Sequence, residues 1–132
     1  MTAAGLLDTS VFIASETHRP LNPAELPAEM FVSVITSAEL QVGVLAATDT
    51  ATRARRLATF NSIAHLELLP VDSEAAAHWA DFRVRLALAG KRMNVNDLWI
   101  ATIAAANDLP VVTQDADFHP IADLGGPAVV RV

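Results

Sequence analysis

Short apolar runs alternate with longer segments of helical periodicity along the chain, and this alternation restricts the fold more than any other feature. The runs typical of strands are residues 5–7, 30–33, 67–71, 111–113 and 128–132. Helices are predicted at residues 9–15, 34–45, 50–64, 73–89 and 94–107. This order predicts an α/β fold, with a mostly parallel five-stranded sheet covered by helices on both faces. The 132 residues suit one compact domain, residues 1–132.

Other parts of the chain are predicted in more detail. Residues 19–27 contain three prolines and are expected to form a loop, or a short helix with a proline near its start. Helix 34–45 carries apolar residues on one face, namely Ile35, Ala38, Val42 and Leu45. In helix 50–64 the residues expected to face inward are Leu57, Phe60 and Ala64, with Ile63 close by.

Cysteine is absent, which excludes disulfides and thiolate metal sites. No export signal is visible, because residues 1–14 lack Lys and Arg and Asp8 interrupts their apolar run. The apolar stretch at residues 98–106 is far shorter than the roughly 20 residues that a membrane helix requires. We therefore expect a soluble, cytoplasmic protein without a membrane anchor.

Charge and hydrophobicity limit the partners of the chain. Hydrophobic residues make up 52% and charged residues 18%, below the usual charged fraction of about 25%. This predicts either an apolar surface that a partner covers or alanine-rich helices that are buried. The net charge of −6 argues against nucleic-acid binding mainly through Lys and Arg, although bound metal ions can supply positive charge at a phosphate. Most basic residues lie in residues 53–56 and 83–92, which fit either an RNA path or the solvated face of a helix.

Acidic side chains gather at one predicted edge of the sheet, where the carboxyl ends of strands bind ligands in such folds. Asp8 directly follows the first strand, and Asp115 and Asp117 follow the fourth. Glu39 lies a little over one turn into the helix after the second strand, and Asp97 lies at the start of the helix before the fourth. No Lys or Arg lies within three residues of any of them. Such a cluster repels itself unless a cation or protons neutralise it.

Each acidic residue also fits a structural role when taken singly. Asp8 and Asp97 suit helix N-caps, Thr36 with Glu39 matches a capping box, and the two aspartates after the fourth strand suit turns. Only the whole set indicates a bound cation. Carboxylate oxygens favour a hard ion, Mg²⁺ above all, with Mn²⁺ as a substitute.

Metal-assisted phosphodiester hydrolysis is the chemistry that such a site predicts. The hydroxyls of Thr9, Ser10 and Thr113 lie beside the predicted ligands. They are expected either to bind a phosphate or a metal-bound water, or to act as local caps.

Four segments, in this order, resemble the signature stretches of PIN-domain nucleases: LLDTSVFIA (6–14), SVITSAELQVG (33–43), NDLWIATIA (96–104) and VVTQDADF (111–118). They most resemble the VapC toxins of bacterial type II toxin–antitoxin pairs. The resemblance implies an α/β/α sandwich and a magnesium-dependent endoribonuclease that acts on RNA as the toxin of such a pair. It also implies a homodimer and an inhibiting VapB-like antitoxin.

The resemblance carries the family's metal ligands onto Asp8, Glu39, Asp97 and Asp115, and a further acidic position onto Asp117. Whether Asp115 or Asp117 is the closer ligand stays open at this level.

Two alternative functions are compatible with the same residues. One is a DNA nuclease or a flap-type nuclease with the same acidic site. The other is a non-enzymatic interaction module in which the acidic residues are caps only. Phosphoryl transfer through an aspartyl phosphate is disfavoured, because Ser10 stands where the dehalogenase pattern needs a second Asp, and Lys91 precedes rather than follows the late strand.

Overall fold

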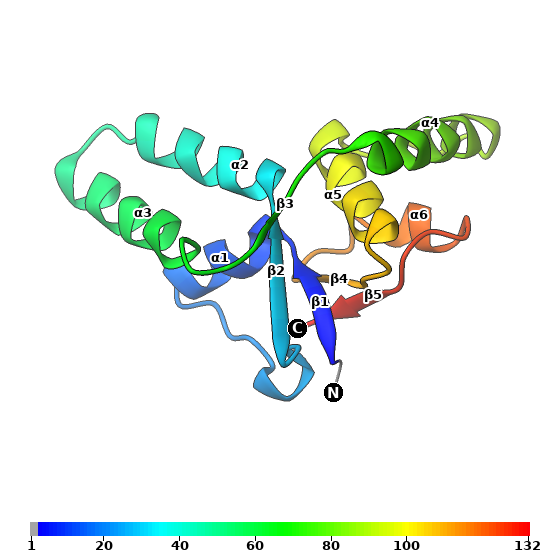
Figure 1. Ribbon diagram of the computed structural model, residues 1–132. Coiled ribbons are helices and arrows are strands. Elements are labelled where there is room, and N and C mark those ends of the chain that lie inside the picture. Colours follow the sequence, from blue (N-terminus) through cyan, green and yellow to red (C-terminus); the bar gives the residue numbers. More distant parts are fainter. Residues whose placement is uncertain (1–2) are drawn as a thin grey trace.

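A fully parallel sheet forms the centre of the computed structural model, which describes residues 3–132 (Figure 1). Its strands are β1 (Ala4–Leu7), β2 (Glu29–Ser33), β3 (Leu68–Leu69), β4 (Val111–Thr113) and β5 (Val129–Arg131). They lie in the order β3-β2-β1-β4-β5, and each neighbouring pair is parallel. The predicted α/β fold with five strands is confirmed.

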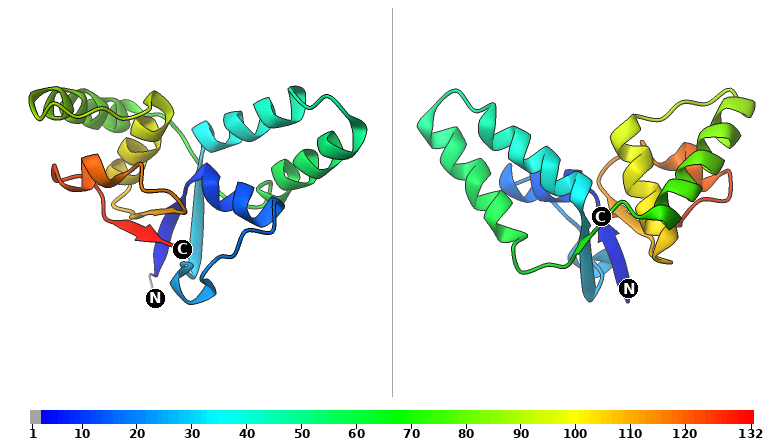
Figure 2. Two further views of the ribbon diagram at one scale, coloured as in Figure 1. Left: turned by 180° about the vertical axis from the view of Figure 1, so that it is seen from behind. Right: turned by 45° about the horizontal axis from the view of Figure 1, so that its top comes forward.

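Helices cover both faces of this sheet, as the strand-helix alternation predicts. One layer contains α1 (Thr9–Glu16), α2 (Val34–Leu45) and α3 (Thr50–Ser62), and the other contains α4 (Ser73–Leu88), α5 (Val95–Ala106) and α6 (His119–Ala122). Figure 2 shows the two layers diverging from the edge at which β1 and β2 end. In residues 3–132, no helix combines the length and apolar content needed to cross a membrane.

The core is divided between the two faces because successive strand residues point to opposite sides. Leu6 and Val111 face α5 and belong to the larger core, whereas Leu7 and Val112 face α1. Helix α5 is buried along residues 98–104 apart from Trp99. This burial explains why the sequence of α5 is almost continuously apolar, whereas the other helices alternate apolar and polar residues. Leu98, Ile100 and Ile103 each contribute roughly 1.5–3 kcal/mol through burial.

Several sequence predictions need correction. Helix α3 ends at Ser62 rather than at residue 64, and Leu57 and Ala64 are exposed rather than inward-facing, whereas Ile63 just beyond the helix is buried. In α2, Val42 and Leu45 are 63% and 80% exposed. The reason is that α2 and α3 pack mainly against each other in a hairpin that extends beyond the short strand β3.

Two short helices complete the fold. The 3-10 helix η1 (Pro23–Glu25) has a proline at its start, so one of the two forms predicted for residues 19–27 is confirmed. The four-residue helix α6 was not predicted, because its length gives no periodic signal and Pro120 is typical of turns as well as of first helical turns.

Candidate active site

The carboxyl ends of β1, β2 and β4 meet at one edge of the sheet and place the predicted acidic residues around one cavity. Asp8 follows β1, Glu39 comes from α2 after β2, Asp97 comes from the first turn of α5, and Asp115 follows β4. All four line a pocket of about 300 Å³, together with Thr9, Ser10, Ile13 and Arg19. The predicted convergence of these residues is therefore present in the structure.

Asp8 is the most deeply placed of the carboxylates, with 3% of its surface exposed. It is also the N-cap of α1, where its carboxylate accepts a hydrogen bond from the Ser10 amide at 3.4 Å. Burial raises the pKa of Asp8, and hydrogen bonds from Ser10 and Thr113 partly oppose that rise. The structural and the site role of Asp8 therefore coexist in one side chain.

Thr113 holds the floor of the pocket together. Its single hydroxyl proton is donated to Asp8 Oδ2 at 3.0 Å, and its oxygen accepts from the amide of Asp115 at 3.0 Å. Because that proton is committed, the 3.1 Å contact with Ser10 Oγ requires Ser10 to be the donor. Ser10 Oγ in turn accepts from the amide of Gln114, so the hydroxyls tie the start of α1 to the loop after β4.

Glu39 is positioned by Thr9 and not by a capping box. Thr9 Oγ1 donates to Glu39 Oε1 at 2.7 Å, so its 2.9 Å contact with Thr36 is a hydrogen bond that Thr36 donates. The N-cap of α2 is Ser33, whose hydroxyl accepts from the amide of Thr36. The helix cap is thus supplied elsewhere, and the Glu39 carboxylate faces the pocket.

Asp97 carries the strongest electrostatic signature of the site. Burial and the neighbouring negative charges, Asp8 first among them, raise its pKa to about 7. Asn94, rather than Asp97, caps α5 by accepting from the amides of Asn96 and Asp97. The capping explanation for Asp97 is therefore wrong, and no structural role of this kind accounts for its position.

The two aspartates after β4 differ in exposure. Asp115 lines the pocket, whereas Asp117 is exposed and lies outside that lining. Both nevertheless raise the pKa of Asp97, and Asp117 does so more strongly than Asp115. Asp117 therefore lies outside the lining, at the rim of the pocket, whereas Asp115 belongs to the lining.

Arg19 is a site residue that sequence reasoning missed. Among the described residues, it is the one basic side chain that lines the carboxylate pocket. Helix α1 ends in a Schellman motif, in which His18 takes a left-handed φ of 58° and the Arg19 amide donates to Ala14 O at 2.8 Å. Glycine is the usual residue at such a turn. Because histidine occupies this position, the sequence gives no sign that the chain turns back toward the pocket.

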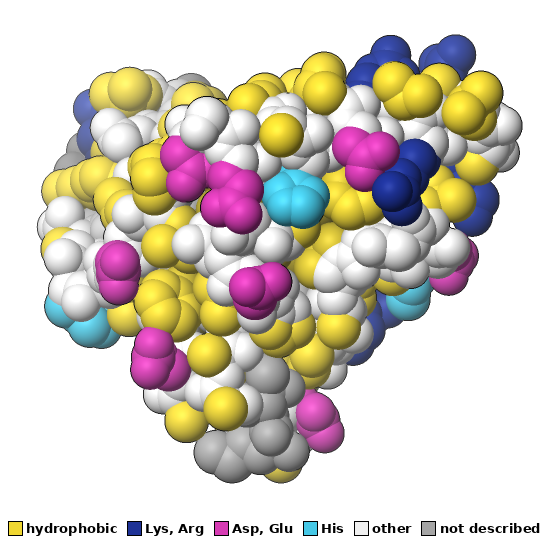
Figure 3. Space-filling model, turned by 45° about the vertical axis from the view of Figure 1, so that its right-hand side comes forward, with side chains coloured by type: hydrophobic (Ala, Val, Ile, Leu, Met, Phe, Trp, Pro, Cys, Tyr) yellow, Lys and Arg dark blue, Asp and Glu magenta, His cyan; other side chains and the backbone are white. Residues whose placement is uncertain are grey.

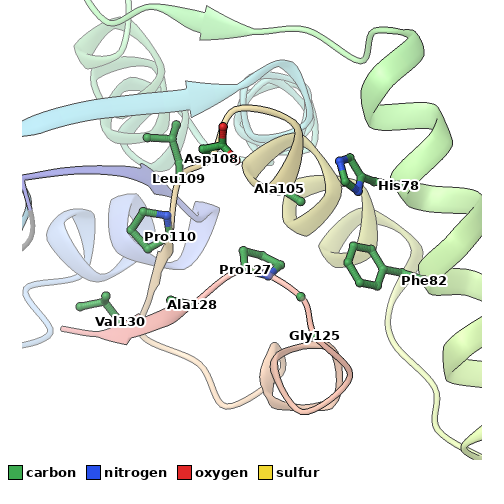
Figure 4. A pocket seen from close by; sticks show the side chains of 11 residues that line it. His78, Phe82, Ala105, Asp108, Leu109, Pro110, Gly125, Pro127, Ala128 and Val130 are labelled. Carbon is green, nitrogen blue, oxygen red and sulfur yellow. The ribbon is translucent and has the colours of Figure 1, made fainter.

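A second, larger cavity lies at the opposite end of β4 and β5. It has a volume of about 560 Å³ and a mostly apolar lining. Figure 4 shows His78 and Phe82 pointing from α4 toward Pro110 and Pro127. Asp108 is the one carboxylate in its lining, so this cavity lacks the clustered acidic groups of the smaller pocket.

The chemistry of the smaller pocket fits a hard divalent cation. Its donors are carboxylate and hydroxyl oxygens, which such ions prefer, and burial together with the neighbouring carboxylates raises the pKa of Asp97. Within residues 3–132, no three acidic or histidine side chains converge closely enough, as they stand, to hold a metal ion. Loading would therefore involve rotation of these side chains.

Comparison with known proteins first identifies the protein family to which this fold and this site belong. The PIN-domain family model matches residues 5–124, a range that contains all the acidic residues described above. Ribonuclease VapC5 of Mycobacterium tuberculosis is 52% identical over 130 residues, covering 98% of this chain and 96% of that protein. Ribonuclease VapC4 of the same organism is 38% identical over 120 residues, with 90% and 92% covered.

A solved structure identifies the group within the PIN-domain family that this chain resembles. The crystal structure of VapBC-5 from Mycobacterium tuberculosis, a member of the VapBC family of toxin–antitoxin systems, matches with a TM-score of 0.88 and 53% identity. The match covers 98% of this chain and 99% of that chain. The chain therefore belongs to the PIN-domain family and, within it, to the VapC ribonucleases of toxin–antitoxin systems. The predicted family is confirmed, and PIN-domain ribonucleases generally depend on divalent metal ions.

Proposed function

We propose that this protein hydrolyses RNA phosphodiester bonds in a Mg²⁺-dependent reaction, as the endoribonuclease toxin of a toxin–antitoxin pair. The observation that carries the proposal is the gathering of four carboxylates around one cavity, where their mutual repulsion contributes to the raised pKa of Asp97. A divalent cation in this cavity would relieve the repulsion that the fold otherwise has to tolerate.

Asp8, Glu39, Asp97 and Asp115 are the proposed metal ligands, with Asp117 at the rim. A bound Mg²⁺ would supply positive charge at the scissile phosphate and make water a stronger nucleophile. The protein's own part is to hold the ligands in place. Two hydroxyls do this, because Thr9 bonds to Glu39 and Thr113 bonds to Asp8. Each leaves the second carboxylate oxygen of its partner available.

Arg19 is proposed to contact a phosphate of the substrate. Arg19 lines the same pocket as the carboxylates, and Arg presents a fork of donors that matches phosphate oxygens. A cation at this position reduces the repulsion between an acidic pocket and a polyanionic substrate. This matters in a chain with a net charge of −6.

An antitoxin is the proposed occupant of the groove between α1 and α2. This groove is lined by Ile13, Leu40 and Arg56, and it shares Ile13 and Glu39 with the carboxylate pocket. Val42, the residue before the groove residue Gly43 on α2, is exposed. A partner segment with apolar side chains could thus be seated next to the active site, consistent with the VapBC toxin–antitoxin structure that the chain resembles.

A homodimer is the proposed assembly. Val84 and Leu88 lie one turn apart on α4 and are 58% and 85% exposed. A second copy of the chain is proposed to cover these side chains, as the low charged fraction of the sequence suggests. Light scattering on the purified protein tests this proposal, and the mass of a single chain at micromolar concentration would contradict it.

A substrate panel tests the proposed function. RNA and DNA oligonucleotides of one sequence, each single-stranded and double-stranded, are incubated with the protein in Mg²⁺, in Mn²⁺ and in EDTA. The proposal predicts cleavage of single-stranded RNA in either metal and none in EDTA. Preferential cleavage of DNA would support the alternative nuclease. Folded protein that cleaves nothing in this panel, nor total cellular RNA, would support the interaction module.

A further inference from the structure

A basic hollow lies beside the carboxylate pocket, on the other side of the first turn of α5. It has a volume of about 550 Å³, and its basic lining residues are Arg83, Lys91 and Arg92. They come from the last turns of α4 and from the loop that leads to α5. Figure 3 shows several Lys and Arg side chains at the upper right of that view, with one acidic side chain lying against one of them.

The loop geometry that forms this hollow is well defined. Helix α4 ends in a Schellman motif, with Gly90 at a φ of 67° and the Lys91 amide donating to Leu86 O at 2.9 Å. The turn places Lys91 and Arg92 in the same hollow as Arg83 of the helix. The three cations are thus brought together by the backbone.

Three other arginines of the chain are engaged by hydrogen bonds or an ion pair within the fold. Arg53 and Arg56 donate to the carbonyls of Ala47 and Gly43 near the end of α2. Arg85 is bound both to Asp81 and to the Leu124 carbonyl.

The cations of the hollow are much less engaged. Lys91 lies 3.6 Å from Asp123. Arg83 and Arg92 are exposed, and their side chains make no hydrogen bond or ion pair within residues 3–132. In a chain with a net charge of −6, this leaves positive charge free for a polyanion.

The hollow and the carboxylate pocket are neighbours. Val95 and Leu98 line the hollow, whereas Asp97 between them lines the carboxylate pocket. Val95 and Asp97 are about 3 Å apart along the helix axis but about 200° apart around it, so the two cavities lie on opposite sides of one helical turn. A chain of phosphates that crosses the first turn of α5 therefore passes from one cavity to the other.

We propose that the basic hollow binds backbone phosphates of single-stranded RNA that flank the bond cleaved in the carboxylate pocket. This inference rests on the proposed function and adds the direction of the substrate, which runs from the pocket over α5 toward the end of α4. Arg83 and Arg92 make the main contacts, and the aliphatic part of the lining, including Met93 and Leu86, shapes the hollow. Phosphate contacts of this kind are independent of base sequence.

The test measures binding separately from cleavage. Fluorescence anisotropy follows a labelled random-sequence oligoribonucleotide on the Asp97→Asn variant, which is expected to bind RNA without cutting it. In this background, Arg83→Gln/Arg92→Gln is compared with Arg55→Gln/Arg131→Gln, which removes the same charge from α3 and β5. The Arg83→Lys/Arg92→Lys variant keeps the charge, and thermal melting confirms that each variant is folded.

The hollow variant is expected to weaken RNA binding at least tenfold and to reduce the slope of log K against log salt by about 1–1.5, since each lost contact on a single strand removes roughly 0.7. The control pair is expected to change binding less than threefold, and the lysine variant to retain most of it. Equal weakening in the control pair, or an unchanged hollow variant, would overturn the inference. Cleavage by the otherwise wild-type protein is measured in parallel, so failure of the proposed function would show separately.

Discussion

Thr113 Oγ1 donates a hydrogen bond to Asp8 Oδ2 across the two central strands of the sheet, at 3.0 Å and in a fully buried position. This contact connects the end of β4, which leads to the proposed ligand Asp115, to Asp8, which follows β1 and caps α1. The relative position of these two carboxylates therefore depends on the Thr113 hydroxyl, which does not itself need to contact the metal or the substrate.

Replacing Thr113 by valine is expected to lower stability by about 1–3 kcal/mol, because the buried Asp8 oxygen and the Asp115 amide both lose a partner. Cleavage is expected to fall by roughly 10–100-fold, as is typical when the support of a metal ligand is removed. Thr113→Ser should retain most of both properties. Thr102→Val is the control, since Thr102 is equally buried but bonds only to the Trp99 carbonyl. An active Thr113→Val variant would contradict the role of this hydroxyl.

The pKa of Asp97 leads to a prediction about pH. The folded, metal-free protein holds a proton on Asp97 up to about pH 7, whereas the unfolded chain releases it near pH 4. The associated stability is thus present below pH 4 and is lost as the pH rises through 7. In EDTA, Asp97→Asn should become more stable than wild type by on the order of 1 kcal/mol at pH 8, allowing for partial solvent screening. Thermal melting from pH 5 to 8 measures this difference.

The same titration predicts how metal binding depends on pH. Asp97 has to lose its proton to act as a ligand, so Mg²⁺ should raise the melting temperature of wild type more at pH 8 than at pH 6. The Asp97→Asn variant should show little metal-induced shift at either pH. A stability difference between the two proteins that stays constant from pH 5 to 8 would be evidence against the raised pKa.

Asp115 and Asp117 are expected to contribute unequally to cleavage. Asp115 lines the pocket, so Asp115→Asn removes a proposed metal ligand and should lower kcat/KM at least about 100-fold, above the roughly 10–100-fold typical for the loss of a ligand's hydrogen-bonding partner. Asp117 is exposed at the rim, so Asp117→Asn should cost roughly tenfold. Steady-state kinetics on one RNA substrate decide the order. If Asp117→Asn proves the more damaging substitution, Asp117 is the closer ligand.

Arg19→Gln is expected to lower kcat/KM by roughly 10–100-fold, the value of one charge-assisted hydrogen bond to a phosphate. Arg19→Lys should recover part of the loss, because the charge remains but the planar fork of donors does not. Arg55→Gln on α3 serves as the matched control. If Arg19→Gln cleaves the same RNA with the kinetics of wild type, the proposed contact between Arg19 and a substrate phosphate is contradicted.

Sequence patterns predicted the sheet and the acidic residues because both depend on local rules. An apolar run followed by Asp8, or by Asp115, places a carboxylate at the carboxyl end of a parallel strand wherever the strand sits in the sheet. The strand order could not be predicted in this way, because β3 has only two residues and its pairing with β2 depends on the α2–α3 hairpin.

The parts that were missed depend on non-local geometry. Arg19 reaches the pocket through a left-handed turn at His18 that has no glycine to mark it. The bond between Thr113 and Asp8 joins residues 105 positions apart. The exposure of Val42 and Leu45 could not be distinguished from burial, because helical spacing gives an apolar face without saying what covers it.

One measurement tests the central claim most directly, namely that the carboxylate pocket is the site of metal-dependent RNA hydrolysis. Total cellular RNA is incubated with wild type in Mg²⁺, with wild type in EDTA, and with folded Asp97→Asn in Mg²⁺. Discrete cleavage with wild type in Mg²⁺ alone is the predicted result, and mapping of the fragment ends would identify the target. Equal cleavage by Asp97→Asn, or cleavage by wild type that persists in EDTA, would contradict the account.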